Sequence, residues 1–174
     1  INTKGPIQTI NEFIKISNSR DQKEKVVIID GDVFFNIDIL SKIRKQTYSS
    51  LFYFKTKETK PIYSYIKLHK KDVIETAEKI KISSNANCGV YFFSSLEILQ
   101  KNINLSLKKS KKNLYISDVY KLLLKNKIRV KSVLLNKNDF SILGTPNQIR
   151  EFSLKKDNKT QTFFISFHSL YDEF

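Results

Sequence analysis

The stretch Val26-Val27-Ile28-Ile29-Asp30-Gly31-Asp32 decides the fold class of this 174-residue chain. Four consecutive β-branched apolar residues predict a strand that is buried on both faces, as in a parallel sheet under helices. Ligands of open α/β sheets gather at the carboxyl ends of strands, so Asp32 is a candidate ligand for Mg²⁺. The alternative is a tight turn in which Asp30 and Asp32 accept hydrogen bonds from backbone amides around Gly31.

On either side of this stretch, segments with strand patterns alternate with segments of helical periodicity. This alternation predicts an α/β fold, a three-layer Rossmann-like sheet with helices on both faces. The expected strands are 50–55, 62–68, 73–78, 89–93, 128–135 and 163–167, of which 62–68 and 73–78 form an antiparallel pair. Helices are expected near 7–16, 37–43, 96–99 and 117–124, and after Pro146.

The length of 174 residues predicts one domain, because about 100 to 200 residues build a single core. The chain has no Met and begins at Ile1, so we expect residues 1–174 to be one N-terminally incomplete domain. Residues 160–174 could begin a further segment. They faintly resemble the first strand of a haloacid-dehalogenase-type phosphatase, but Ser166 and His168 stand where that motif needs carboxylates.

The charge and the single cysteine limit the surroundings in which the chain works. Thirty-one Lys and Arg against 17 Asp and Glu give a formal net charge of +14, which favours anionic partners such as phosphates, nucleic acid or acidic lipid. Cys88 alone allows no intrachain disulfide, which fits a reducing compartment, and we expect a cytoplasmic protein. No apolar run approaches the roughly 20 residues of a membrane span.

Six short segments follow one another in an order that is more informative than any one of them. They are 5–8 (Gly-Pro-Ile-Gln), 29–32 (Ile-Asp-Gly-Asp), 77–79 (Ala-Glu-Lys), 87–93 (Asn-Cys-Gly-Val-Tyr-Phe-Phe), 114–119 (Leu-Tyr-Ile-Ser-Asp-Val) and 144–149 (Gly-Thr-Pro-Asn-Gln-Ile). Together they resemble the sugar-phosphate nucleotidyltransferases. The resemblance implies transfer of a nucleotidyl group from a nucleoside triphosphate to a sugar 1-phosphate, with release of pyrophosphate, in nucleotide-sugar synthesis for surface polysaccharide.

The resemblance also implies roles for individual residues. Asp32, holding Mg²⁺, and Lys79, holding the sugar phosphate, are the implied catalytic residues. Gln8 would contact the base. Gly31, Glu78, Asn87 and Gly89 complete the implied substrate-binding set, with the last three facing the sugar.

The pair Glu78-Lys79 suits such a substrate chemically. An ammonium on a flexible stem can reach a phosphate oxygen, and a carboxylate accepts hydrogen bonds from sugar hydroxyls. Neighbours on a strand point to opposite faces, so one of the two must lie where the backbone bends. The alternative for this pair is a solvated charge pair, and the alternative for Gly89 is a strand bulge.

The chain departs from the family pattern at two places. The family's Gly-x-Gly-x-Arg loop, which holds the triphosphate through backbone amides, has no counterpart here. Ile142 stands where the family has a second metal-binding aspartate, and Asp139 would face the opposite side of a strand. These departures support an alternative: a non-catalytic relative that binds a sugar phosphate or a partner subunit.

A basic nucleic-acid-binding domain is the third hypothesis. Lys108-Lys109 and Lys111-Lys112 lie near Tyr115, and lysines beside a stacking aromatic can bind nucleic acid. A solvated loop explains the same run more simply, so nucleic acid is not our expected partner. His69 and His168 are expected to be surface or structural residues. The sequence leaves the nucleotide, the sugar and homo-oligomer formation open.

Overall fold

The computed structural model describes residues 3, 5–16, 21–109 and 114–155. Several sequence-based expectations fall outside these residues. They are the strand 163–167, the segment 160–174, His168, and the lysines at 111 and 112. The expectations for all other segments can be compared with the structure.

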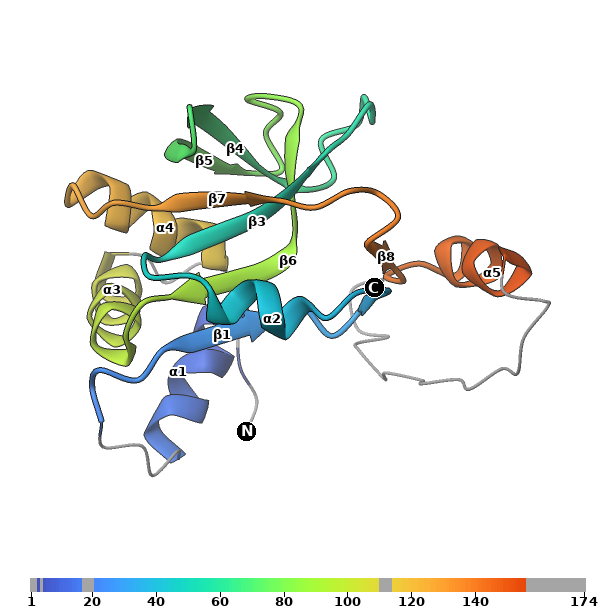
Figure 1. Cartoon of the computed structure of the whole chain (residues 1–174). Coiled ribbons are helices and arrows are strands. Elements are labelled where there is room, and N and C mark those ends of the chain that lie inside the picture. Colours follow the sequence, from blue (N-terminus) through green and yellow to red (C-terminus); the bar gives the residue numbers. More distant parts are fainter. Residues whose placement is uncertain (1–2, 4, 17–20, 110–113, 156–174) are drawn as a thin grey trace.

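A mixed six-stranded sheet forms the centre of the described chain (Figure 1). Its strand order is β1-β6-β3-β7-β5-β4, and β3 and β7 run parallel while the other neighbouring pairs run antiparallel. The strands are β1 (Val26–Ile29), β3 (Ser50–Lys55), β4 (Ser64–His69), β5 (Asp72–Glu78), β6 (Asn85–Phe93) and β7 (Lys131–Leu134). A separate antiparallel pair joins β2 (Val33–Phe35) to β8 (Phe140–Ile142).

Helices cover the two faces of this sheet unequally. The helices α1 (Pro6–Ile16), α3 (Leu96–Lys109) and α4 (Ile116–Lys125) share one hydrophobic core with one face, while α2 (Ile39–Arg44) packs with the other. The side chains of β3 point alternately to the two faces of the sheet. Leu51 and Tyr53 lie in the first core, and Phe52 and Phe54 lie in the second. None of the helices in the described ranges is long and apolar enough to cross a bilayer.

The fold class is confirmed as mixed α/β, whereas the three-layer Rossmann-like description stays a prediction. The expected antiparallel pair 62–68 and 73–78 is confirmed as β4 and β5. The expectation that the strand at 26–29 is buried on both faces is wrong. This strand, β1, pairs antiparallel with β6 at the edge of the sheet, and Val27 and Ile29 are each 37% exposed. A β-branched run favours extended backbone but does not determine where in a sheet the strand lies.

The helix α4 ends in a Schellman motif with an unusual residue. The N–H of Ile128 donates to the carbonyl of Leu123 (2.9 Å), and the N–H of Lys127 donates to the carbonyl of Leu124 (3.0 Å). These are the two hydrogen bonds of that motif, in which the residue after the cap takes a left-handed conformation and is usually glycine. Here Lys127 takes it, with a φ of 57°.

The helix α5 (Pro146–Lys155) lies to one side of the sheet in Figure 1. Its start follows β8 directly, and its residue Phe152 packs edge-to-face on Phe34 of β2, with ring centroids 5.1 Å apart. An aromatic pair of this geometry contributes about 0.5–1.5 kcal/mol beyond its buried area. The contact therefore holds α5 against the two-stranded sheet.

Candidate active site

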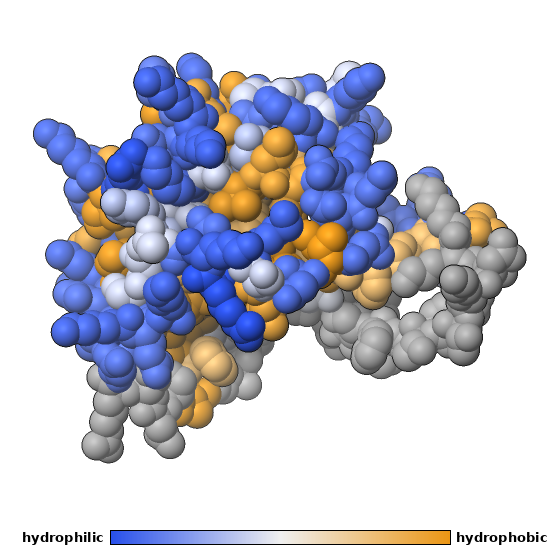
Figure 2. All heavy atoms as spheres, viewed as in Figure 1, coloured by the Kyte–Doolittle hydropathy of each residue, from blue (hydrophilic) through white to orange (hydrophobic). Residues whose placement is uncertain are grey.

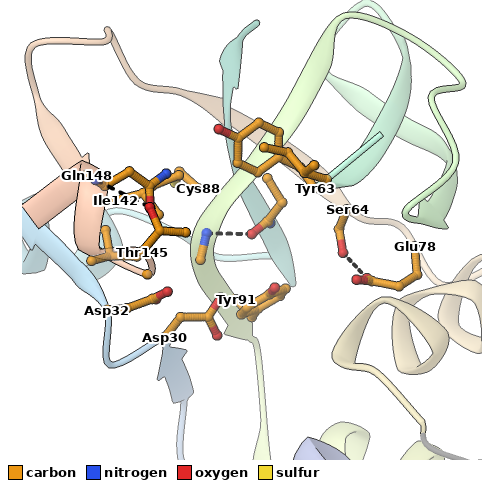
Figure 3. A pocket seen from close by; sticks show the side chains of 15 residues that line it. Asp30, Asp32, Tyr63, Ser64, Glu78, Cys88, Tyr91, Ile142, Thr145 and Gln148 are labelled. Atoms are coloured by element: carbon orange, nitrogen blue, oxygen red, sulfur yellow. Dashed lines mark hydrogen bonds between the residues drawn. The ribbon is translucent and has the colours of Figure 1, made fainter. Parts of the chain in front are cut away.

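A pocket of about 350 Å³ opens between the turn after β1, the middle of β6, the adjoining ends of β4 and β5, and the start of α5. Figure 3 shows this pocket from close by. Three carboxylates line it, those of Asp30, Asp32 and Glu78, and its described lining contains no lysine, arginine or histidine. In a chain with a net charge of +14, the described part of this lining is acidic.

The turn that carries the two aspartates is fastened on both sides by backbone hydrogen bonds. The N–H of Asp30 donates to the carbonyl of Gly89 in β6 (2.8 Å), and the N–H of Leu143 donates to the carbonyl of Asp32 (2.7 Å). The backbone turns at Gly31 and Asp32, whereas the hydrogen bonds from backbone amides to the two carboxylates, which the sequence offered as an alternative, stay a prediction. This turn excludes no ligand role, because both carboxylates line the pocket.

Two glycines leave the space that these carboxylates occupy. A Cβ added to Gly89 would lie 2.9 Å from Oδ2 of Asp30, and one added to Gly144 would lie 2.5 Å from Oδ2 of Asp32. Gly89 also has a φ of +81° and lies where the pairing of β6 with β3 shifts register. It is thus part of a strand irregularity, as its alternative interpretation had it, and it also lines the pocket.

Glu78 and Lys79 leave the end of β5 in different directions. Oε2 of Glu78 accepts hydrogen bonds from the hydroxyls of Ser64 and Ser117, the latter at 3.0 Å. Lys79 has a φ of 50°, which confirms the expected bend. Its Nζ lies 5.7 Å from the centroid of the Tyr115 ring, and Lys79 is not among the residues that line the pocket.

Asn87 has a buried amide nitrogen that has no hydrogen-bond partner among the described residues. Its side chain cannot be turned round without loss, because the N–H of Gly89 donates to Oδ1 at 2.7 Å. Asn87 is 5% exposed and lines the pocket. A buried donor without an acceptor costs about 1–3 kcal/mol. An acceptor oxygen of a bound ligand would remove that cost.

The other expected site residues lie elsewhere. Gln8 belongs to α1 and Gly31 to the turn between the aspartates, and neither is among the pocket residues. Ile142 does line the pocket. Asp139 does not, and its Oδ2 accepts a hydrogen bond from the N–H of Asn136 (2.9 Å).

Burial keeps two further pocket groups neutral. It raises the pKa of the Cys88 thiol to about 12, and the carboxylate of Asp30 adds to the rise. The Cys88 side chain is buried. Burial likewise raises the pKa of the Tyr91 hydroxyl, with smaller contributions from Asp30 and Glu78. Tyr91 therefore keeps its proton, and the Cys88 thiol is a poor nucleophile at neutral pH.

Sequence reasoning did not single out several residues that line the pocket or touch its carboxylates. Tyr91 had a usable signal, because Asn87, Gly89 and Tyr91 alternate along one strand. Ser117 lies in the quoted segment 114–119 but was given no role, and Tyr63 and Ser64 had no signal. Ser64 meets Glu78 only because β4 and β5 pair in that register, and Ser117 meets it only because α4 packs near β5.

The donor set of the pocket fits a hard cation such as Mg²⁺. Within the described residues no group of three or more His, Cys, Asp and Glu could hold a metal. Mg²⁺ does not require such a group, because it commonly takes one or two carboxylates and completes its shell with water and substrate phosphates. Asp30 and Asp32 offer two carboxylates, and the amide of Asn87 offers a donor to a ligand oxygen.

Solved structures share this fold. The nucleoside-diphosphate-sugar pyrophosphorylase from Vibrio cholerae RC9 aligns with a TM-score of 0.72 and 20% identity, over 87% of this chain and 66% of that one. The inositol-1-phosphate CTP transferase from T. maritima aligns with a TM-score of 0.66 and 16% identity, over 92% of this chain and 67% of that one. The chain thus spans about two thirds of the length of these proteins. Curated protein sequences give no match.

The similarity to these two solved structures defines the fold class of the chain as mixed α/β. The family model for nucleotidyl transferases then matches residues 2–159, which is most of the chain. The chain belongs to the nucleotidyl transferase family.

Proposed function

We propose that the protein transfers a nucleotidyl group from a nucleoside triphosphate to a sugar 1-phosphate and releases pyrophosphate. One observation carries the proposal: the pocket brings Asp32 together with Glu78, Asn87 and Gly89, which lie in a different part of the sequence. Family membership supports the same chemistry. Synthesis of surface polysaccharide and a cytoplasmic location stay predictions.

The reaction needs no covalent intermediate with the protein. A phosphate oxygen of the sugar phosphate forms a bond to the α-phosphorus, the bond from that phosphorus to the β-phosphate oxygen breaks, and pyrophosphate leaves with the electron pair. Both reactants are anionic, so charge neutralisation and alignment supply most of the catalysis. Mg²⁺ bound at Asp32 would neutralise phosphate charge.

The side chains of the chain itself would orient the sugar. Glu78 would accept hydrogen bonds from sugar hydroxyls, and its direction is set by the hydroxyls of Ser64 and Ser117. Asn87 would donate its unpartnered N–H to a sugar oxygen. Lys79 would bind the phosphate after its ammonium leaves the ring of Tyr115, an exchange that a flexible exposed side chain makes at little cost.

Pyrophosphate release by the full chain tests this function. With a nucleoside triphosphate, a sugar 1-phosphate and Mg²⁺, we expect release that depends on both substrates. Asp32→Asn should lower kcat about a hundredfold, because a metal contributes several kcal/mol of charge stabilisation. Asp139→Asn is the matched control and should keep its activity, since Asp139 lies outside the pocket. Equal rates for both variants would contradict the role of Asp32.

A non-catalytic relative is the second candidate, and Ile142 favours it. This residue lines the pocket with an aliphatic side chain, which cannot coordinate a metal. The two candidates differ in one measurement. If a sugar phosphate binds the chain, substitutions in the pocket weaken that binding, and no pyrophosphate is released, the binding protein is favoured over the enzyme.

A further inference from the structure

We propose that Tyr115 is a positioning residue for Lys79. Its ring holds the ammonium of Lys79 outside the pocket in the free protein, and a phosphate group draws the ammonium in. The inference rests on the proposed function, because it assumes that Lys79 binds the phosphate of the sugar phosphate. It goes beyond that function in giving Tyr115, which does not line the pocket, an effect on phosphate affinity.

The first step is the place where the side chain of Lys79 begins. The N–H of Lys79 donates to the carbonyl of Tyr63 (3.0 Å). Tyr63 lines the pocket, and so does Glu78, the residue before Lys79. The backbone of Lys79 is therefore fixed at the wall of the pocket, although Lys79 itself is not among the residues that line it.

The second step is the place where this side chain ends. Nζ of Lys79 lies 5.7 Å from the centroid of the Tyr115 ring, within the range of about 6 Å over which an ammonium is attracted to a ring. Within the described residues, the ammonium forms no ion pair with a carboxylate. The ring is therefore the contact that the ammonium gives up when it moves. A charge-assisted hydrogen bond to a phosphate oxygen is stronger than such a contact.

The third step is the anchor of the ring. Tyr115 is the N-cap of α4, where its N–H donates to Oδ2 of Asp118 (3.0 Å) and its carbonyl accepts from the N–H of Asp118 (2.9 Å). Two residues further on, the hydroxyl of Ser117 donates to Oε2 of Glu78 (3.0 Å). The first turn of α4 thus contacts both members of the pair, Glu78 in the pocket wall and Lys79 beside it.

The fourth step is the consequence for affinity. A contact that exists only in the free protein stabilises the free state, and so it weakens the binding of any ligand that breaks it. Removal of the Tyr115 ring should therefore strengthen phosphate binding. An ammonium–ring contact at an exposed site corresponds to about a two- to fivefold change in affinity. A ring that served only the fold would not give this increase.

Magnetic resonance of the lysine side chains tests the contact in the full chain. The protein is made with isotope-labelled lysine, and the signal that is lost in Lys79→Arg assigns the ε-methylene of Lys79. Protons over the face of an aromatic ring resonate upfield, so this signal should lie upfield of other lysines in wild type and in Tyr115→Phe. In Tyr115→Leu, which keeps the backbone hydrogen bonds of the cap, the signal should return to the ordinary position.

Titration with inorganic phosphate at constant ionic strength then tests the exchange. In wild type, the ε-methylene signal of Lys79 should move to the ordinary position as phosphate binds. The affinity of every variant is followed through the backbone amide signal of Lys79, and Tyr115→Leu should bind phosphate about two- to fivefold more tightly than wild type. Tyr48→Leu is the matched control. It removes a ring that lies 5.4 Å from the guanidinium of Arg129, outside the pocket, and should change neither measurement.

Three results would overturn the proposal: a wild-type Lys79 signal at the ordinary position, a signal that stays upfield at every phosphate concentration, or unchanged or weaker phosphate binding in Tyr115→Leu. Tyr115→Gln gives a second variant without the ring should the leucine variant not fold. Phosphate that releases Lys79 from the ring, without any pyrophosphate release in the activity assay, would uphold the role of Tyr115 and refute the transferase. Pyrophosphate release with a Lys79 signal that phosphate does not move would do the reverse.

Discussion

At the scale of single residues, two glycines leave the space that the carboxylates of the pocket occupy. Gly89 and Gly144 each lie against a carboxylate oxygen of the acidic turn. Gly89 has a second constraint, since its φ of +81° belongs to the region that residues with a Cβ rarely enter. The lack of space for a Cβ and the backbone conformation thus both require glycine at position 89.

The substitution Gly89→Ala should destabilise the protein and distort the acidic turn. The left-handed conformation costs a residue with a Cβ about 1–2 kcal/mol, and overlap with Asp30 and Val33 at 2.9 Å adds to this. We expect an unfolding free energy lower by about 2 kcal/mol or more, measured in urea, together with weaker Mn²⁺ binding.

Gly31→Ala is the matched control for that experiment. Gly31 is exposed and has no positive φ, so alanine there should change the unfolding free energy by less than about 0.5 kcal/mol. Equal losses for the two variants would show that the turn, and not the contact at Gly89, sets the effect.

Cys88 should react slowly with alkylating reagents in the native protein. Burial raises its pKa to about 12, so at pH 8 the thiolate fraction is roughly one in ten thousand, whereas an ordinary thiol of pKa ~8.5 is about one quarter ionised. The native labelling rate should be at least about a hundredfold lower than the rate in urea. It should also rise with pH well beyond pH 8.5, as a raised pKa requires. Equal rates in both states would contradict this environment.

The sequence predicted residues with a local pattern and missed those that depend on packing. Asp32, Glu78, Asn87 and Gly89 lie in short motifs, and all four line the pocket. The direction of Lys79 was not predictable, because it follows from a left-handed residue at the end of a strand. The roles of all these residues stay predictions until binding is measured.

At the scale of elements, the sequence predicted where strands run better than which strands they join. The expected segments 50–55 and 73–78 correspond closely to β3 and β5. The expected burial of the strand at 26–29 failed because a run of four β-branched residues also suits a half-exposed edge strand. Pairing depends on residues far away in the chain, such as the β6 segment opposite β1.

The end of α4 allows a stabilising substitution. Lys127 holds a φ of 57° in a Schellman motif, a place where glycine has no steric cost. Lys127→Gly should raise the unfolding free energy by about 1 kcal/mol, measured by urea denaturation.

Lys125→Gly, in the last turn of the same helix, is the matched control. Glycine inside a helix costs about 1 kcal/mol relative to good helix formers, so this change should lower stability by a similar amount. Destabilisation by Lys127→Gly would show that the lysine side chain contributes more than its strained backbone costs.

At the scale of the whole molecule, a chain of positive net charge carries a pocket whose described lining holds three carboxylates and no lysine, arginine or histidine. The formal net charge is +14, and Figure 2 shows hydrophilic side chains over much of the face it presents. The described residues hold four ion pairs, all with partly or largely exposed side chains, and such pairs contribute little. Repulsion among unpaired positive charges should therefore outweigh attraction in the folded state.

Added salt should accordingly stabilise the protein. Screening of like charges favours the compact state, and the few exposed ion pairs lose little by it. Between about 20 mM and 200 mM potassium chloride we expect the melting temperature to rise by a few degrees, where 1 kcal/mol corresponds to about 2–4 °C for a chain of this length. A falling melting temperature would mean that attractive pairs dominate.

The ring contact between Phe34 and Phe152 has a practical consequence for anyone who shortens this chain. Thr145 and Gln148 form part of the pocket wall. The helix that contains Gln148 is held against the two-stranded sheet by Phe152, which is not among the residues that line the pocket. A trimmed version that stops just after the wall would keep every lining residue and still lose the clamp that holds one side of the cavity. Boundaries for truncated versions therefore belong beyond Phe152.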